Sequence, residues 1–196
     1  MNVDYWRHYM RARMFELLRQ PEAALDSYRA ALQCEPHSAS THHALAYLYA
    51  KQKRYAEAEP HFREVLRLRP NNADAWFNLG FLYDEQRDAA RAIDAFRESV
   101  RLNPKLDRAW YGLGLSLVSL GNHAEAVKAL REAAELQPMN GFAWYHLGIT
   151  YHALDMTTKV TEVAKHMNRF DRKLTRQLIH DTGRADLRHL VSDMKV

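Results

Sequence analysis

The sequence predicts an all-α fold built from about five copies of one helical hairpin. Four prolines, Pro36, Pro70, Pro104 and Pro138, follow one another at a constant interval, and other residue types recur in step with them. A fixed period of about 34 residues is the signature of a repeat architecture, in which each unit buries its apolar face against its neighbours. The chain has only seven glycines among 196 residues and is rich in Ala, Leu, Arg and Glu, which favours helix throughout.

The first half of each copy carries one apolar face. When the copies are aligned on the prolines, a column of Trp, a column of Leu, a column of small residues and a column of Tyr are separated by three, one and three residues. Residues at these separations lie on one side of a helix. In the copy that begins at residue 73 they are Trp76, Leu79, Gly80 and Tyr83.

The second half of each copy carries another apolar face, which packs on the first. In the same copy Ala92, Phe96 and Ser99 stand four and three residues apart. Small residues such as Gly80 and Ala92 let two antiparallel helices approach closely, while larger side chains fill the space beside them. The residue before each proline is driven out of the helical region, so Asn103 ends one helix before the next begins. We therefore expect hairpins at residues 5–38, 39–72, 73–106, 107–140 and 141–174.

These spaced Trp, Leu, Gly, Tyr, Ala, Phe and Pro columns resemble the tetratricopeptide repeat family, whose unit has the same period. The resemblance covers Tyr5 to about Leu174. It implies a right-handed superhelix, or α-solenoid, of stacked hairpins, in which the first helices line a concave groove where peptides bind. The function that it implies is a non-catalytic scaffold for protein–protein interaction.

The two ends of the array depart from the pattern. In the first copy His8 and Arg11 replace Trp and Leu, as suits a terminal helix with one side in water. In the fifth copy Arg172 stands in the proline column, which leaves the second helix free to run on past Asp171. Residues 175–196 are expected to form a capping helical segment. The apolar stripe at its start consists of Leu174, Leu178 and Ile179.

No arrangement of residues predicts catalysis or metal binding. The one cysteine, Cys34, stands in an otherwise apolar column, so we expect it to be a buried packing residue. The histidines His42 and His43 are neighbours, and His146 and His152 are six residues apart, so neither pair has the i, i+4 spacing of a ligand clamp. We therefore expect no enzymatic activity, no cofactor, no bound metal and no small-molecule substrate.

Cysteine usage, hydropathy and charge suggest a compartment and one further class of partner. The single cysteine cannot form an intramolecular disulfide, the amino terminus lacks the apolar core of a secretory signal, and no stretch is long and apolar enough to span a bilayer. We therefore expect a cytoplasmic protein. The net charge of +4 resides from Thr157 onward, where nine Lys or Arg stand against five acids. This basic end could attract anionic partners. Because acidic residues are interleaved with the basic ones, we rank nucleic acid last among the possible partners.

A second set of residues on the first helices predicts the binding surface. A helix with one buried face does not need two, yet these residues recur at i, i+3 or i+4, and i+7, roughly opposite the Trp-Leu-Gly-Tyr face. Aromatic anchors with a few polar neighbours are typical of recognition surfaces. The predicted groove residues are Tyr9, Arg13, His43, Tyr47, Phe77, Asn78, Phe81, Arg108, Tyr111, Leu115, Tyr145 and His146.

Two interpretations of the groove residues stay open. Peptide binding is favoured for Phe77, Tyr111 and Tyr145. For one other column, packing between adjacent first helices explains the apolar character as well as binding does. That column is Tyr47, Phe81, Leu115 and Ile149.

Some members of the family clamp the C-terminal carboxylates of heat-shock chaperones with Lys and Asn in the groove. Asn78 matches one of these clamp positions, but Tyr9, His43 and Phe77 stand where the clamp has lysine. The departure argues against a chaperone clamp. The Asn78 side chain can both donate and accept, so a hydrogen bond with the backbone amide of a ligand suits it better than a role in such a clamp.

Three functional hypotheses follow in order. The first is a scaffold that holds a peptide segment of a partner protein in an aromatic groove, with Arg13, Arg108 and Asn78 fixing its orientation. The second is a self-associating or regulatory domain, whose groove or terminal edge is filled by another copy or by a further part of the same protein. The third is binding of an anionic partner by the basic end around Arg169 and Arg172.

Overall fold

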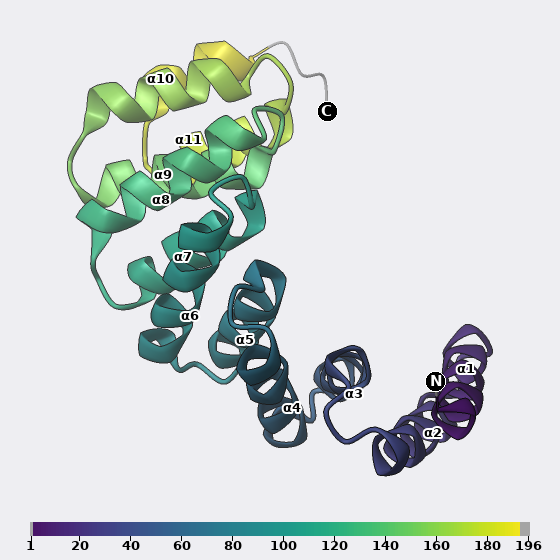
Figure 1. The fold of residues 1–196 in the computed structure, drawn as a ribbon. Coiled ribbons are helices and arrows are strands. Elements are labelled where there is room, and N and C mark those ends of the chain that lie inside the picture. The colour runs from purple at the N-terminus through teal and green to yellow at the C-terminus, as the bar shows by residue number, and fades with distance from the viewer. Residues whose placement is uncertain (1, 193–196) are drawn as a thin grey trace. The chain divides into compact units, whose positions relative to one another are not determined.

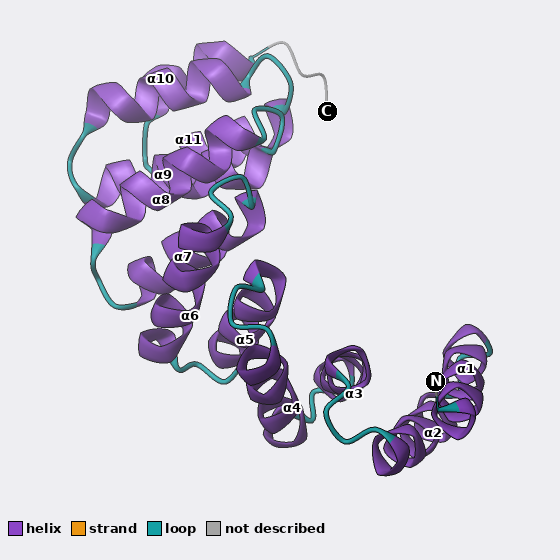
Figure 2. Cartoon of the chain, in the orientation of Figure 1, coloured by secondary structure: helices purple, strands orange, loops and turns teal. Residues whose placement is uncertain are grey.

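The computed structural model describes residues 2–192 and consists of helices joined by short turns (Figures 1 and 2). Strands are absent from that range, so the predicted all-α class is confirmed. The helices are α1 (Val3–Leu17), α2 (Pro21–Cys34), α3 (Ala39–Lys51), α4 (Tyr55–Leu68), α5 (Ala73–Glu85), α6 (Ala89–Leu102), α7 (Asp107–Ser119), α8 (His123–Leu136), α9 (Gly141–Ala153), α10 (Thr157–Met167), α11 (Arg172–Asp181) and the 3-10 helix η1 (Ala185–Val191).

The chain divides into two compact units, Met1–Arg87 and Asp88–Val196. The first contains α1 to α5, and the second contains α6 to α11 with η1. Within the units, successive helices pack as pairs, α1 with α2, α3 with α4, α7 with α8 and α9 with α10. The boundary between the units falls inside the segment 73–106, so the division into five repeats stays a prediction.

A left-handed residue makes the turn after α1, α3, α5, α7 and α9. After α1, α3, α7 and α9 the amide that follows returns to a carbonyl in the last turn of the helix, as the Arg54 amide does to the Tyr49 carbonyl at 2.9 Å, which is the usual way to satisfy a helix end. Only one of the five is a glycine, so the turn geometry recurs although the residue type does not. The left-handed residues are Arg19, Lys53, Arg87, Gly121 and Asp155.

The fifth second helix ends earlier than predicted. α10 stops at Met167 and does not run on past Asp171. Instead, the Asp171 side chain accepts a hydrogen bond from the Leu174 amide at 2.9 Å and caps the start of α11. An N-cap of this kind stabilises the start of a new helix. The sequence prediction missed this start because no proline marks it. Residues 193–196 of the predicted capping segment lie outside the described residues.

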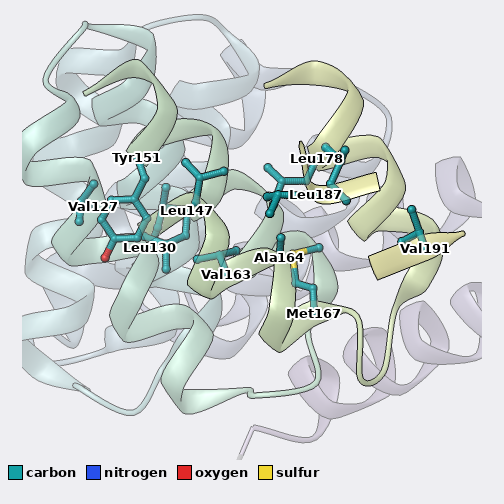
Figure 3. Close-up of a cluster of buried hydrophobic side chains, with 12 residues drawn as sticks. Val127, Leu130, Leu147, Tyr151, Val163, Ala164, Met167, Leu178, Leu187 and Val191 are labelled. Atoms are coloured by element: carbon teal, nitrogen blue, oxygen red, sulfur yellow. The ribbon is translucent and has the colours of Figure 1, made fainter. Parts of the chain in front are cut away.

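The second unit has a continuous apolar core, to which α11 contributes (Figure 3). Leu130, Leu147 and Leu178 are almost completely buried there. The predicted close approach within a hairpin is present between α7 and α8, because a Cβ added at Gly114 would lie 2.6 Å from the Leu130 Cγ atom, and α11 approaches α9 as closely, since a Cβ added at Gly148 would lie 2.8 Å from the Leu178 Cδ1 atom. The capping role of α11 therefore rests on buried leucine side chains. By contrast, Cys34 in the first unit is only half-buried, so the prediction of a buried packing residue was wrong.

Candidate interaction surfaces

The Trp column anchors each first helix to the loop before it by a hydrogen bond. The indole N–H donates to the carbonyl oxygen of the proline six residues earlier, and the imidazole of His42 makes the same contact where His replaces Trp. The sequence pattern indicated packing for this column but not the hydrogen bond. The pairs are Trp76 with Pro70 at 3.1 Å, Trp110 with Pro104 at 2.8 Å, Trp144 with Pro138 at 2.9 Å and His42 with Pro36 at 2.9 Å.

The Tyr column is bound by a column of arginines that was not among the predicted residues, although these also recur with the period of the prolines. Three of these four guanidinium groups donate to a tyrosine hydroxyl on the following first helix. Where Leu117 replaces Tyr, Arg97 donates instead to Glu125 at 2.7 Å. The arginine column therefore links second helices to first helices. The pairs are Arg29 with Tyr49 at 2.6 Å, Arg63 with Tyr83 at 3.1 Å and Arg131 with Tyr151 at 3.0 Å.

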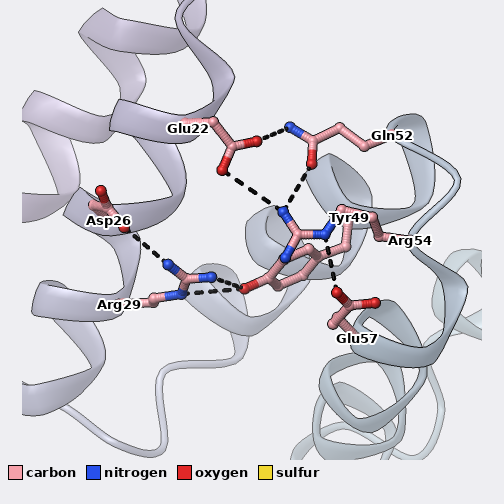
Figure 4. A network of polar contacts seen from close by, with 7 residues as sticks. All are labelled: Glu22, Asp26, Arg29, Tyr49, Gln52, Arg54 and Glu57. Carbon is pink, nitrogen blue, oxygen red and sulfur yellow. Dashed lines mark hydrogen bonds and ion pairs between the residues drawn. The ribbon is translucent and has the colours of Figure 1, made fainter.

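A second guanidinium strengthens the first of these links (Figure 4). Arg54 lies over the Tyr49 ring at 4.7 Å and forms an ion pair with Glu57 at 3.0 Å. It also reaches Glu22 on α2 at 3.6 Å. Exposed pairs of this kind contribute little singly, but together they fix α2, α3 and α4 around one tyrosine.

Seven of the twelve predicted groove residues lie in the first unit, on α1, α3 and α5. Two of these are already engaged within the first hairpin. Tyr9 is half-buried, with its ring stacked on Tyr5 and edge-on to Tyr28, and Arg13 pairs with Glu16 at 3.3 Å. The side chains of Tyr9 and Arg13 are therefore already held by contacts within the protein, and they are less available to a ligand than an uncontacted side chain would be.

α3 and α5 share a polar contact at the predicted groove. The Asn78 amide nitrogen lies 3.3 Å from the His43 Nε2 atom, so the Asn78 amide is bound to its neighbour. Burial lowers the pKa of His43, against a smaller opposing effect of Asp74, so the ring is neutral at pH 7. Phe77 beside them is half-buried.

Tyr47 and Phe81 are the exposed aromatic residues of this set. Tyr47 on α3 is 51% exposed and Phe81 on α5 is 47% exposed. Tyr47 also lines a cavity of about 500 Å³ together with Glu16 and Leu48. Packing between helices therefore leaves about half of each residue's surface exposed to water.

The other five predicted residues lie in the second unit, on α7 and α9. Tyr111 is edge-on to His146 with ring centroids 5.8 Å apart. Burial raises the pKa of Tyr111 and lowers that of His146, so both are neutral at pH 7. Leu115 packs against the core, in agreement with the packing interpretation, while Arg108 is exposed.

Tyr145, the fifth of these, is held by α11. Its hydroxyl donates to the Asp181 carboxylate at 2.6 Å, and Gln177 lies 3.5 Å away. Burial, followed by the bond to Asp181, raises the pKa of Tyr145. Its ring therefore belongs to the contact between α9 and α11.

Metal sites and membrane spans are not found among the described residues. In that part of the chain, no cluster of three or more His, Cys, Asp or Glu side chains could hold a metal. Between residues 2 and 192, none of the helices has the length and apolar character needed to cross a bilayer.

Comparison with known proteins identifies the repeat. Two family models match, a tetratricopeptide repeat model over residues 43–107 and a TPR repeat model over residues 114–155. Together they cover more than half of the chain. No curated protein matches this sequence.

Solved structures share the fold at low sequence identity. MamA from Desulfovibrio magneticus RS-1 is 21% identical, with a TM-score of 0.79 over 92% of this chain and 98% of that one. YrrB, described as a TPR protein with an unusual peptide-binding site, is 23% identical, with a TM-score of 0.76 over 87% and 89%. PilF of Pseudomonas aeruginosa is 18% identical, with a TM-score of 0.71 over 97% and 93%. The family models and the shared fold agree with the recurring columns, and the chain belongs to the tetratricopeptide repeat family.

Proposed function

We propose that this protein is a non-catalytic scaffold that binds a peptide segment of a partner protein on the face that the first helices α1, α3 and α5 form in its first unit. The family and the fold are those of protein–protein interaction scaffolds. One observation carries the finer proposal: Tyr47 and Phe81, which occupy one column of the repeat, each keep about half of their surface exposed on adjacent first helices. Half-exposed aromatic side chains on a rigid scaffold are suited to anchor a partner. The peptide-binding site described for YrrB supports the same class of ligand.

The test is selection of peptides from a random display library, followed by calorimetric titration of a selected peptide. Y47A/F81A should weaken binding about tenfold or more, because each anchor residue of an interface contributes roughly 1 kcal/mol or more. The matched control is L120A/M139A, which truncates two exposed apolar side chains that do not belong to the predicted groove set. Equal affinity of Y47A/F81A and the control would contradict the assignment.

A second candidate function, self-association, is favoured by α1. Val3, Met10, Met14 and Leu17 are all exposed, and their spacing of seven, four and three residues places them along one side of the helix. A continuous apolar stripe of this kind is typical of an interaction surface, and a second copy of the chain is the proposed occupant. Light scattering over about a hundredfold range of concentration should show a mass that rises with concentration. A constant monomer mass, or a rise that M10E/M14E leaves unchanged, would exclude α1 as the interface.

A further inference from the structure

α11 lies alongside α9 and runs in the same direction. At the start of α9, a Cβ added to Gly141 would lie 2.6 Å from an Asp171 carboxylate oxygen and 2.8 Å from Leu174. Further along, the Tyr145 hydroxyl meets Gln177 and Asp181. The exposed side of α11 is therefore continuous with the first-helix face of α9.

Three exposed cations on α11 have no acidic partner between residues 2 and 192. Arg172, Lys173 and Arg176 make no ion pair or side-chain hydrogen bond with any described residue. They fall within two turns of one helix, on the side away from its buried residue Leu178, and Arg172 and Arg176 border the buried Ile179.

The nearby acids are already engaged. Asp171 caps α11, and Asp181 accepts from the Tyr145 hydroxyl and lies 2.9 Å from His180. Elsewhere in the described chain, exposed arginines commonly pair with an acid one turn away, as Arg101 does with Glu98 at 2.8 Å. The charge on α11 is thus unbalanced locally.

An exposed aromatic ring adjoins these cations. Phe142 on α9 is 61% exposed and stands one turn before Tyr145. Gly141, next to Phe142 in sequence, meets Asp171 and Leu174, so Phe142 lies near the first turn of α11, which carries Lys173. An exposed apolar ring and positive charge therefore lie near each other at the start of α11.

We propose that this surface, made of Phe142, Arg172, Lys173 and Arg176, binds an acidic peptide segment in which Asp or Glu flank an apolar side chain. Opposite charges complement each other across such an interface, and arginine binds carboxylates in a planar, two-point geometry. The inference rests on the proposed function, because it specifies the chemistry of a peptide that the protein binds and assigns its binding surface to the second unit.

Other anionic partners fit this surface less well. The three cations span less than two turns, between Asp171 before them and Asp181 at the end of α11, so a continuous chain of phosphates laid along the helix would meet only a short positive stretch. A membrane-surface helix needs a free apolar face, whereas Leu178 and Ile179 on α11 are buried in the core. Separate carboxylates on a peptide can match the three cations and avoid both acids.

The experiment selects peptides from one random display library in parallel on the unmodified protein, K173E/R176E and K105E/K128E. The last variant carries the same change in net charge at two exposed lysines of the same unit that have no ion pair among the described residues. We expect the unmodified protein and K105E/K128E to enrich peptides with acids beside an apolar residue. K173E/R176E should bind these peptides about tenfold or more weakly, and binding to the unmodified protein should fall as salt rises.

Several outcomes would overturn the inference. Selected peptides without acidic enrichment, or an equal loss in K105E/K128E, would do so. So would binding of a single-stranded oligonucleotide or of phosphatidylserine vesicles that K173E/R176E abolishes while peptide binding is unchanged. Peptides that depend on Tyr47 and Phe81 but not on Lys173 and Arg176 would leave the proposed function standing and remove this inference alone. If no peptide is selected, both fall. K173Q/R176Q, with an unchanged unfolding temperature, checks that the loss is not a loss of fold.

Discussion

His42 and His61 form a hydrogen-bonded pair between α3 and α4. Their Nδ1 atoms lie 2.9 Å apart, while the His42 Nε2 atom lies 2.9 Å from the Pro36 carbonyl oxygen. His42 therefore donates to Pro36 through Nε2 and accepts from His61 through Nδ1. Burial, followed by the effects of His42 and Arg29, lowers the pKa of His61 to about 4.

This pair predicts a loss of stability in mild acid. An unfolded histidine titrates near 6.5, so between about pH 6.5 and about pH 4 the unfolded state binds a proton that folded His61 does not. The contribution of His61 to the free energy of unfolding is full above pH 6.5 and falls towards pH 4. After discounting for partial exposure, about 1 kcal/mol is expected, or roughly 2–4 °C in unfolding temperature.

Thermal unfolding of the protein and of H61Q at pH 7.5 and pH 5 provides the measurement. Gln can still donate to His42 but does not titrate, so the difference between the two pH values should shrink in H61Q. An identical pH dependence in both proteins would show that His61 does not carry the effect.

The roles of single site residues could not be predicted from the sequence, because their polar groups bind side chains on neighbouring helices. Asn78 was expected to meet a ligand and Tyr145 to bind one, yet the Asn78 amide meets His43 and the Tyr145 hydroxyl meets Asp181. These partners lie 35 and 36 residues away in sequence. Helical spacing shows which face a residue occupies, but not which side chain on the next helix takes its polar group.

At the scale of elements, the arginine and tyrosine columns couple one hairpin to the next. Arg131 on α8 donates to the Tyr151 hydroxyl on α9 at 3.0 Å, and Tyr151 is almost completely buried. A hydrogen bond with a charged donor contributes roughly 1.5–3 kcal/mol at most, and less where the guanidinium is exposed. We expect a coupling of about 0.5–1.5 kcal/mol between the two positions.

A double-mutant cycle with R131A and Y151F, followed by urea unfolding, measures this coupling. The control cycle uses R97A and L117V, because Leu117 has no hydroxyl and Arg97 pairs with Glu125 instead. The control should give a coupling near zero. Coupling energies of equal size in both cycles would mean that the hydroxyl is not the source.

The boundaries of the elements could be predicted where the repeat is regular and not where it fails. The first helices α3, α5, α7 and α9 each begin three residues after one of the spaced prolines, because a proline disfavours helix at the residue before it. Beyond α9 the proline is missing, and the break depends on the Asp171 side chain capping α11. A single N-cap aspartate is a weak signal in a sequence, so the end of α10 was misplaced.

At the scale of the whole molecule, the constant period of the prolines and of the columns between them was sufficient to predict the all-α repeat fold and the family. It could not predict the division into two compact units after Arg87, because the same left-handed turn occurs at the equivalent position of every copy. It also could not separate exposed from covered groove residues. Tyr47 and Phe81 stay half exposed while Leu115 packs on the core, although all three share one column.

The most direct test of the central claim locates the bound peptide by photo-crosslinking. The benzophenone amino acid p-benzoylphenylalanine replaces Phe81 in one sample and Leu120 in another, since both side chains are exposed but only Phe81 belongs to the predicted groove. A peptide selected on the unmodified protein is added, the samples are irradiated, and the crosslinks are mapped by mass spectrometry. We expect a crosslink from position 81 that excess unlabelled peptide suppresses, and none from position 120. Crosslinking from position 120 alone would contradict peptide binding on the first-helix face.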